Sequence, residues 1–195
     1  VTLTMAWVRS EYASEFAVLS AWLAMALPWN IAYQPAAALD STVIFVRLSI
    51  IELQIRIPVI IQAGSQLVSA ENALAAQYPG TQLASGLFVA TPIGAVGHYD
   101  GWMGAGSIAW ALAAAVLVGA FAYSLALYRD EAGVAARSPL PPASVVGWLL
   151  AAATVATGVA TALYFLDQDL GGVPVPIGSV IMGALAVAIL RAERR

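Results

Sequence analysis

The sequence contains no cysteine and no lysine, and it has a single histidine. Without cysteine the chain cannot form disulfides, thiolate nucleophiles, zinc–thiolate sites or cysteine-ligated iron–sulfur clusters. One histidine, His98, excludes bis-histidine haem ligation within the chain. A lysine-free chain with a pI of about 4.9 is typical of extreme halophiles, although GC-rich coding would also replace lysine by arginine.

Charge of either sign is scarce. Only 10% of the 195 residues are charged, whereas 61% are hydrophobic, and the net charge is −3. A soluble domain of this length cannot bury so much apolar side chain, so the composition predicts an integral membrane protein with lipids as partners. No nucleic-acid partner is predicted.

Four apolar segments predict membrane-spanning helices: residues 14–33, 102–128, 144–166 and 176–190. The last is shorter than the ~20 residues that a span needs, so we extend it to Val173. The first segment also has features of a signal peptide, and we interpret it as an uncleaved span.

Arginine placement orients these spans. Six arginines fall on one side of a four-span arrangement: Arg9, Arg129, Arg137, Arg191, Arg194 and Arg195. By the positive-inside rule both termini are predicted to be cytoplasmic, together with the loop 129–142. Residues 167–176 are then a tight external turn. The chain divides into residues 1–33 (tail and first span), residues 34–101 (an extracellular segment) and residues 102–195 (the other three spans).

The stretch "STVIFVRLSIIELQIRIPVI", residues 41–60, is apolar but contains Arg47, Glu52 and Arg56. As a membrane helix it would place these charges in hydrocarbon, at about 2.5–3.5 kcal/mol each. Its alternating pattern and β-branched residues instead predict strand, outside the bilayer. The alternation changes phase at residues 50–51, which predicts either two short strands or one bulged strand.

Residues 59–78 carry apolar side chains at helical spacing and predict an amphipathic helix, which ends before Pro79 and Gly80. The segment "LFVAT", residues 87–91, is a candidate for a further strand. The expected fold class is therefore a membrane all-α four-helix bundle with a small extracellular α+β cap of short strands plus this helix.

Polar residues that often carry chemistry have simpler interpretations here. Trp29 and Asn30 read as an interfacial anchor and a turn. Glu11 and Glu15 complement the dipole of the first helix. His98 with Tyr99 and Asp100 lacks metal-ligand spacing, and Asp167 with Asp169 reads as a polar turn. The interiors of the last three spans contain no Asp, Glu, His, Lys or Arg, which disfavours an ion or proton pathway.

Small residues recur at intervals of about four in the spans and predict close helix contacts. They are Gly147, Ala151, Thr154, Gly158 and Ala162 in the third span and Ser179 and Gly183 in the fourth. We expect them to pack within the monomer, with packing against a partner as the alternative.

Two resemblances add to this interpretation. The segment "WVRSEYASEFAVLSAWLAMALPWN", residues 7–30, resembles the start of small uncharacterised four-span proteins of halophilic archaea. The plan of spans, with strands and a helix in a large first external loop, resembles claudin-type tetraspan proteins, and "LPW" at residues 27–29 is similar to the end of their first span. Their Gly-Leu-Trp motif and loop cysteine pair are absent, so junction or paracellular-pore function does not transfer.

The sequence predicts a non-catalytic tetraspan protein that acts through protein–protein interaction as an adhesion protein, a scaffold or an accessory subunit. It predicts no catalytic, cofactor-binding or metal-binding residue. Arg47, Glu52, Gln54 and Arg56 are expected to be exposed on the cap and to contact a protein partner or a second copy. The alternative is a small-molecule or lipid-handling protein or transporter with a pocket between cap and bundle.

Overall fold

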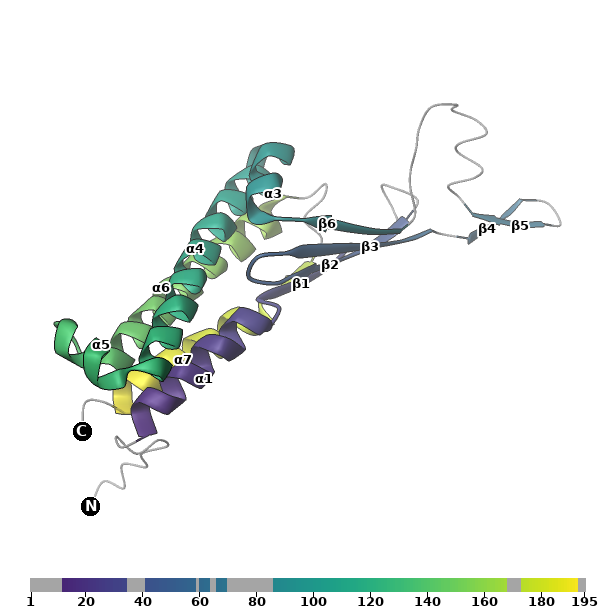
Figure 1. Ribbon diagram of the computed structural model, residues 1–195. Helices are drawn as coiled ribbons and strands as arrows, with labels where there is room; N and C mark the ends of the chain where they lie inside the picture. The colour runs from purple at the N-terminus through teal and green to yellow at the C-terminus, as the bar shows by residue number, and fades with distance from the viewer. Residues whose placement is uncertain are drawn as a thin grey trace, which may run out of the picture.

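The computed structural model describes residues 12–34, 41–58, 60–63, 66–69, 86–167 and 173–192. This part of the chain forms six helices, a five-stranded antiparallel sheet and a separate two-stranded sheet. Four helices lie side by side, and the larger sheet projects from one end of them (Figure 1). The expectation of a mainly helical chain that also carries strands is confirmed.

The four packed helices are α1 (Ala13–Ala26), α4 (Gly101–Arg129), α6 (Pro142–Leu166) and α7 (Ile177–Ala192). Two of them, α4 and α6, are long and apolar enough to cross a membrane, with mean hydropathies of 2.0 and 1.9. The other two are apolar but contain only 14 and 16 residues. Each helix lies within or close to a segment that the sequence predicted as a span.

Alanine dominates the contacts between these helices. Buried alanines lie on all four of them, for example Ala21, Ala113, Ala153 and Ala186. Small side chains let helix backbones approach closely, which increases their van der Waals contact. The bundle is therefore held by close backbone packing, with larger buried side chains such as Trp110 filling the sheet end.

The first and last predicted spans are too long. α1 ends at Ala26, and Asn30–Gln34 forms strand β1, because Pro28 cannot continue a helix. Likewise Val173–Val175 is strand β7, paired with β1, and not part of the last helix. Pro174 and Pro176 flank this change, and a residue before proline favours extended backbone.

The predicted strand in residues 41–57 is confirmed as two strands, β2 (Ser41–Arg47) and β3 (Glu52–Pro58), and not as one bulged strand. They are joined by a tight turn in which the Leu48 N–H donates to the Ile51 carbonyl at 2.8 Å. The further strand is confirmed as β6 (Gly86–Ala90). The strand order is β6-β3-β2-β1-β7, with every neighbour antiparallel.

The amphipathic helix predicted for residues 59–78 is wrong where the structure describes it. Strands β4 (Ile60–Ala63) and β5 (Gln66–Ser69) pair as a hairpin there, and residues 70–78 lie outside the described part. The two short runs, Ile-Ile-Gln-Ala and Gln-Leu-Val-Ser, are separated by Gly-Ser, a pair that is typical of two-residue hairpin turns. The spacing of apolar residues matched the helical period only by ignoring that pair.

Two short helices occupy segments for which the sequence predicted no helix. Helix α3 (Pro92–His98) begins after Thr91, whose hydroxyl accepts from the Gly94 N–H, and it has proline at its first position. Helix α5 (Glu131–Arg137) lies within the loop that was predicted to be cytoplasmic. In Figure 1 α5 lies at the end of the bundle opposite the sheet, near the first turn of α1 and the last turn of α7.

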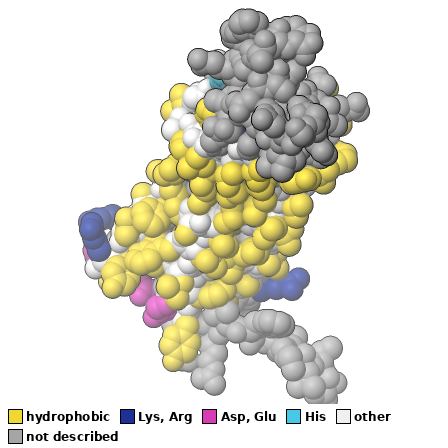
Figure 2. Space-filling model, turned by 90° about the vertical axis from the view of Figure 1, so that its right-hand side faces the viewer, with side chains coloured by type: hydrophobic (Ala, Val, Ile, Leu, Met, Phe, Trp, Pro, Cys, Tyr) yellow, Lys and Arg dark blue, Asp and Glu magenta, His cyan; other side chains and the backbone are white. Residues whose placement is uncertain are grey.

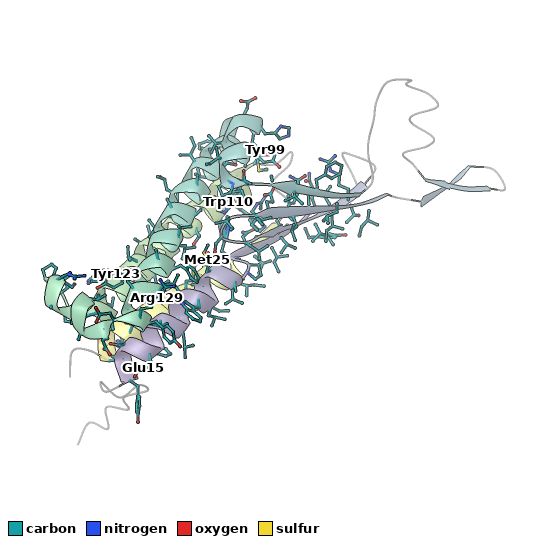
Figure 3. All side chains as sticks on the ribbon, viewed as in Figure 1. Glu15, Met25, Tyr99, Trp110, Tyr123 and Arg129 are labelled. Atoms are coloured by element: carbon teal, nitrogen blue, oxygen red, sulfur yellow. The ribbon has the colours of Figure 1, made fainter. Side chains whose placement is uncertain are left out.

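Charged and apolar side chains are segregated along the bundle. In Figure 2 apolar side chains cover most of the described part of the face shown, and the charged side chains that can be seen lie at its edges and toward its lower end. Figure 3 places Glu15 and Arg129 at that end, whereas Tyr99 and Trp110 lie toward the sheet. The long axis of the bundle therefore runs from a charged end to the sheet.

Candidate functional site

A fully buried ion pair lies where the sheet meets the bundle. Arg47 at the end of β2 is directly opposite Glu52 at the start of β3, because the tight turn 48–51 brings the two strands together there. Their side chains are completely excluded from solvent, and the guanidinium Nε donates to the carboxylate at 2.5 Å. Such a pair needs further hydrogen bonds to offset desolvation.

The bundle and β1 supply those partners. Arg47 also donates to Asn30 Oδ1 at 3.1 Å, and Asn30 donates to Thr161 on α6 at 3.3 Å. The guanidinium carbon lies 4.0 Å from the centroid of the Tyr164 ring and 4.8 Å from that of Phe45. Cation–π contacts of this kind are strongest in a desolvated site.

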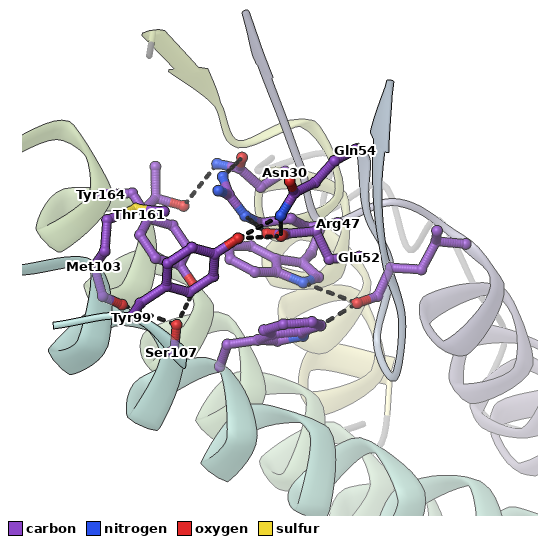
Figure 4. A network of polar contacts seen from close by, with 12 residues as sticks. Asn30, Arg47, Glu52, Gln54, Tyr99, Met103, Ser107, Thr161 and Tyr164 are labelled. Carbon is purple, nitrogen blue, oxygen red and sulfur yellow. Dashed lines mark hydrogen bonds and ion pairs between the residues drawn. The ribbon is translucent and has the colours of Figure 1, made fainter. Parts of the chain in front are cut away.

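Two tryptophans fasten the turn between β2 and β3 to the bundle. Trp29 and Trp110 each donate their indole N–H to the carbonyl of Leu48 at 3.1 Å. The Ser49 hydroxyl donates to the Ala24 carbonyl at 3.2 Å, at the end of α1. The ion pair and its neighbours, drawn in Figure 4, thus form a rigid joint between sheet and helices.

Tyr99, between α3 and α4, closes the carboxylate side of this network. Its hydroxyl donates to Glu52 Oε1 at 3.1 Å, and the Gln54 amide donates both to Glu52 Oε1 at 2.7 Å and to the Tyr99 hydroxyl. Burial and, secondarily, the neighbouring Glu52 carboxylate raise the pKa of Tyr99 well above its ordinary value. Tyr99 therefore stays protonated at physiological pH and acts as a hydrogen-bond donor.

A cavity of about 360 Å³ lies beside this network, between the inner face of the sheet and the helix ends. Its wall is formed by Gln34, Val43, Phe45, Gln54, Arg56, His98, Tyr99, Asp100, Met103 and Asp167. The sheet contributes the cation, Arg56, whereas Asp100 and Asp167 come from the helix side. The guanidinium carbon of Arg56 lies 4.5 Å from the centroid of the Phe88 ring. The Arg56 Nε has no hydrogen-bond partner within the described residues.

The expected exposure of the cap residues is wrong for Arg47, Glu52 and Gln54, which are buried, and Arg56 is half-buried. The alternation that predicted the strands distinguishes their two faces but does not tell which face meets the bundle. The polar face turns inward because Asn30, Tyr99 and the Tyr164 ring contact Arg47 and Glu52, although Arg47 Nη2 has no hydrogen-bond partner among the described residues.

The small residues predicted to pack fall into two groups. Gly147 lies close to Leu190 and Ile189, Gly183 faces Thr154, and Ser179 donates to Thr157 at 2.8 Å. Ala151 packs against the core. Gly158 and Ala162, however, are exposed on α6, so they do not contribute to packing within the molecule.

Other polar residues remain apart from the network. His98 is exposed and contacts the Tyr99 ring edge-on, with a centroid distance of 5.1 Å. Glu15 lies at the charged end of the bundle, and Glu11 and Asp169 fall outside the described residues. Among the described residues no three His, Cys, Asp or Glu side chains gather as a metal site would require.

Sequence reasoning missed two aromatic members of the site, Trp110 and Tyr164, and it considered Tyr99 only as a possible metal ligand beside His98. Trp29 and Asn30 were noticed, but as an anchor and a turn. One signal was present in the sequence, because an arginine and a glutamate five residues apart flank an apolar turn and would pair across a hairpin. The partners from α4 and α6 carry no comparable signal.

The comparisons with known proteins yield a family without an assigned activity. No curated protein matches the chain. A match to a family of unknown function, DUF7549, extends over residues 6–194 and therefore includes the bundle, the sheet and the buried network. The chain belongs to this family of unknown function.

Proposed function

We propose that this chain is a non-catalytic, four-span membrane protein that binds a small zwitterionic molecule in the cavity between sheet and bundle. The proposed topology follows the claudin-type plan described above, with cytoplasmic ends and the sheet outside. The lengths and hydropathies of α4 and α6 support a membrane location. The apolar surface of the bundle between its charged end and the sheet agrees with it (Figure 2).

The observation that supports a zwitterionic ligand is the distribution of charge around the cavity. Arg56 offers a guanidinium from the sheet, with Nε lacking a hydrogen-bond partner in the described part of the chain. Asp100 offers a carboxylate from the helix side. A molecule with an acidic group at one end and an amine at the other complements both walls, and the Phe45 ring adds an apolar surface.

The test is calorimetric titration of the purified protein with glycine, β-alanine and γ-aminobutyrate, which differ in charge separation. Acetate and tetramethylammonium serve as probes with one charge. We expect one zwitterion to bind more tightly than either single-charge probe, and Arg56→Gln to weaken that binding at least tenfold. Arg137→Gln, which changes an exposed arginine of α5, is the matched control. Equal binding to Arg56→Gln and to the native protein would refute the ligand site.

A second candidate is self-association through strand β6. One edge strand of the sheet, β7, contains Pro174, which blocks further pairing, whereas β6 has neither proline nor charge. If two copies pair antiparallel, Phe88 at the centre of β6 faces its counterpart. Phe88→Cys would then cross-link on mild oxidation and Ile93→Cys on α3 would not. Monomer alone from both variants removes this candidate.

A further inference from the structure

The outer face of the five-stranded sheet, turned away from the cavity, carries no charged side chain among the residues that the structure describes. The strand register aligns its side chains in two rows that each cross all five strands. One row is Val175, Ile31, Val46, Leu53 and Val89, and the other is Val173, Tyr33, Ile44, Ile55 and Leu87. Leu87 and Val89 are more than 60% exposed. An apolar patch of this extent marks a contact surface.

The orientation of the outer face follows from that of the inner face of the sheet. The inner face lines the cavity together with Tyr99 and Asp100, which precede α4. In Figure 1 α3 and the first turns of α4 lie beyond the sheet, on the side away from α5. The outer face therefore points toward the end of the bundle at which α5 lies.

The level at which the sheet leaves the bundle can be measured along α4. The turn between β2 and β3 is bonded to Trp110, and α4 runs from there to Arg129 at the charged end, about 28 Å at ~1.5 Å per residue. The hydrocarbon core of a bilayer is about 30 Å thick. If Arg129 lies at one membrane surface, the base of the sheet lies at the edge of the hydrocarbon on the other side.

The lengths of α1 and α7 also place the base of the sheet near the edge of the hydrocarbon. α1 and α7, with 14 and 16 residues, are about 21 and 24 Å long, which is less than the hydrocarbon thickness. Each is continued by a strand of the sheet, β1 after α1 and β7 before α7. Ile50 and Ile51, in the turn held beside the end of α1, are exposed and apolar. Apolar surface thus continues from these helices onto the sheet.

We propose that the outer face of the sheet rests on the lipid of the outer leaflet, an inference that depends on the membrane location proposed above. Five strands spaced by ~4.8 Å, with two to three residues of each on this face, offer only about 400 Å², half of the ~800 Å² that a stable protein interface buries per partner. The face also has no charged group to set the register of a protein partner, and Tyr33 has the amphipathic character that suits the membrane interface.

The absence of cysteine allows a direct test by spin labelling. Leu87→Cys and Ile55→Cys place labels on the outer face. Val155→Cys places one on the exposed surface of α6 in mid-bundle, and Ile93→Cys places one on α3, where the side chain is 83% exposed. Each variant is labelled, reconstituted in phosphatidylcholine vesicles and measured by electron paramagnetic resonance with oxygen and with a water-soluble nickel chelate as relaxing agents.

The expected result is that labels at Leu87 and Ile55 relax mainly with oxygen, as at Val155, whereas the label at Ile93 relaxes mainly with nickel. Nickel-dominated relaxation at Leu87 and Ile55 would place the face in water and overturn the inference. Low accessibility to both agents would also overturn it, because protein would then cover the face, and dipolar broadening would identify a second copy. A label at Val155 that behaves like that at Ile93 would refute the membrane location itself.

Discussion

At the scale of single residues, the joint between sheet and bundle depends on one buried cation. Arg47 has no access to solvent, so its desolvation is offset by contacts within the protein, which among the described residues are with Glu52, Asn30 and the rings of Tyr164 and Phe45. Removing one member of a buried ion pair leaves the other charge uncompensated, which costs more than the pair contributes. The effect of substitution at Arg47 should therefore differ from that at any surface arginine.

We predict that Arg47→Met lowers the free energy of unfolding by about 3–5 kcal/mol, because it leaves the Glu52 carboxylate buried without its cation. The double variant Arg47→Met with Glu52→Leu should recover most of this loss. Denaturant titration in micelles, followed by tryptophan fluorescence, measures both. Arg129→Gln, at an exposed position of α4, should leave the midpoint unchanged. A double variant no more stable than Arg47→Met would show that the charge of Glu52 is not the cause.

Tyr99 makes the stability of the protein dependent on pH at the alkaline end. Its pKa in the folded protein is raised above the ~10 of an unfolded tyrosine, first by burial and then by Glu52. Its contribution is therefore complete below pH ~10 and is lost as the pH rises through 10 toward the folded value. The free energy of unfolding between pH 9 and 11 should fall more steeply for the native protein than for Tyr99→Phe. Equal slopes for the native protein and Tyr99→Phe would contradict the assignment of this pH dependence to Tyr99.

At the scale of elements, the contact between the start of α7 and the end of α1 is a contact between backbones. A Cβ added at Gly178 would lie 2.4 Å from the Pro28 carbonyl oxygen and 2.6 Å from the Trp29 Cα. Backbone atoms cannot move aside as a flexible side chain can. This close approach also carries the hydrogen bond from the Ser179 N–H to the Trp29 carbonyl, at 3.4 Å.

We predict that Gly178→Ala destabilises the protein by about 1–3 kcal/mol, the usual range for overpacking. Gly158→Ala is the matched control, because a Cβ there meets nothing within 4 Å and alanine favours helix. The same denaturant titration compares them, and Gly158→Ala should be neutral or slightly stabilising. Equal midpoints for the two variants would show that α7 shifts without cost.

At the scale of the whole molecule, the arrangement of the ends makes topology testable. The first turn of α1, the last turn of α7 and α5 lie at the same end of the bundle, opposite the sheet (Figure 1). If all four helices cross the membrane, these three regions share one side.

We predict that a reporter placed after Arg195 and one inserted at Gly133 in α5 report the cytoplasm, because six of the eight arginines fall in segments that the four-span arrangement assigns to that side. A reporter at Gly97 in α3 should report the opposite side. Alkaline phosphatase and green fluorescent protein fusions provide the measurement. Opposite sides for the first two positions would refute the four-span topology.

The sequence by itself determined the local features whose cause is local. Long uncharged segments predicted α4 and α6, since burying their apolar side chains does not depend on a particular neighbour. Alternation and β-branching predicted β2, β3 and β6. The error at residues 60–69 arose where a short apolar pattern fits either period, and prolines at 28, 174 and 176 could have shortened the first and last helices.

Only the tertiary structure decided which face of the sheet is buried. Hydrophobic alternation separates an apolar face from a polar face, and the expectation that charged side chains face water placed Arg47, Glu52 and Gln54 on the surface. The opposite holds because Asn30, Tyr99 and Tyr164, from three other parts of the chain, converge to satisfy these groups. The free energy of burying a charge depends on partners that are distant in sequence, and pattern within one segment carries no information about them.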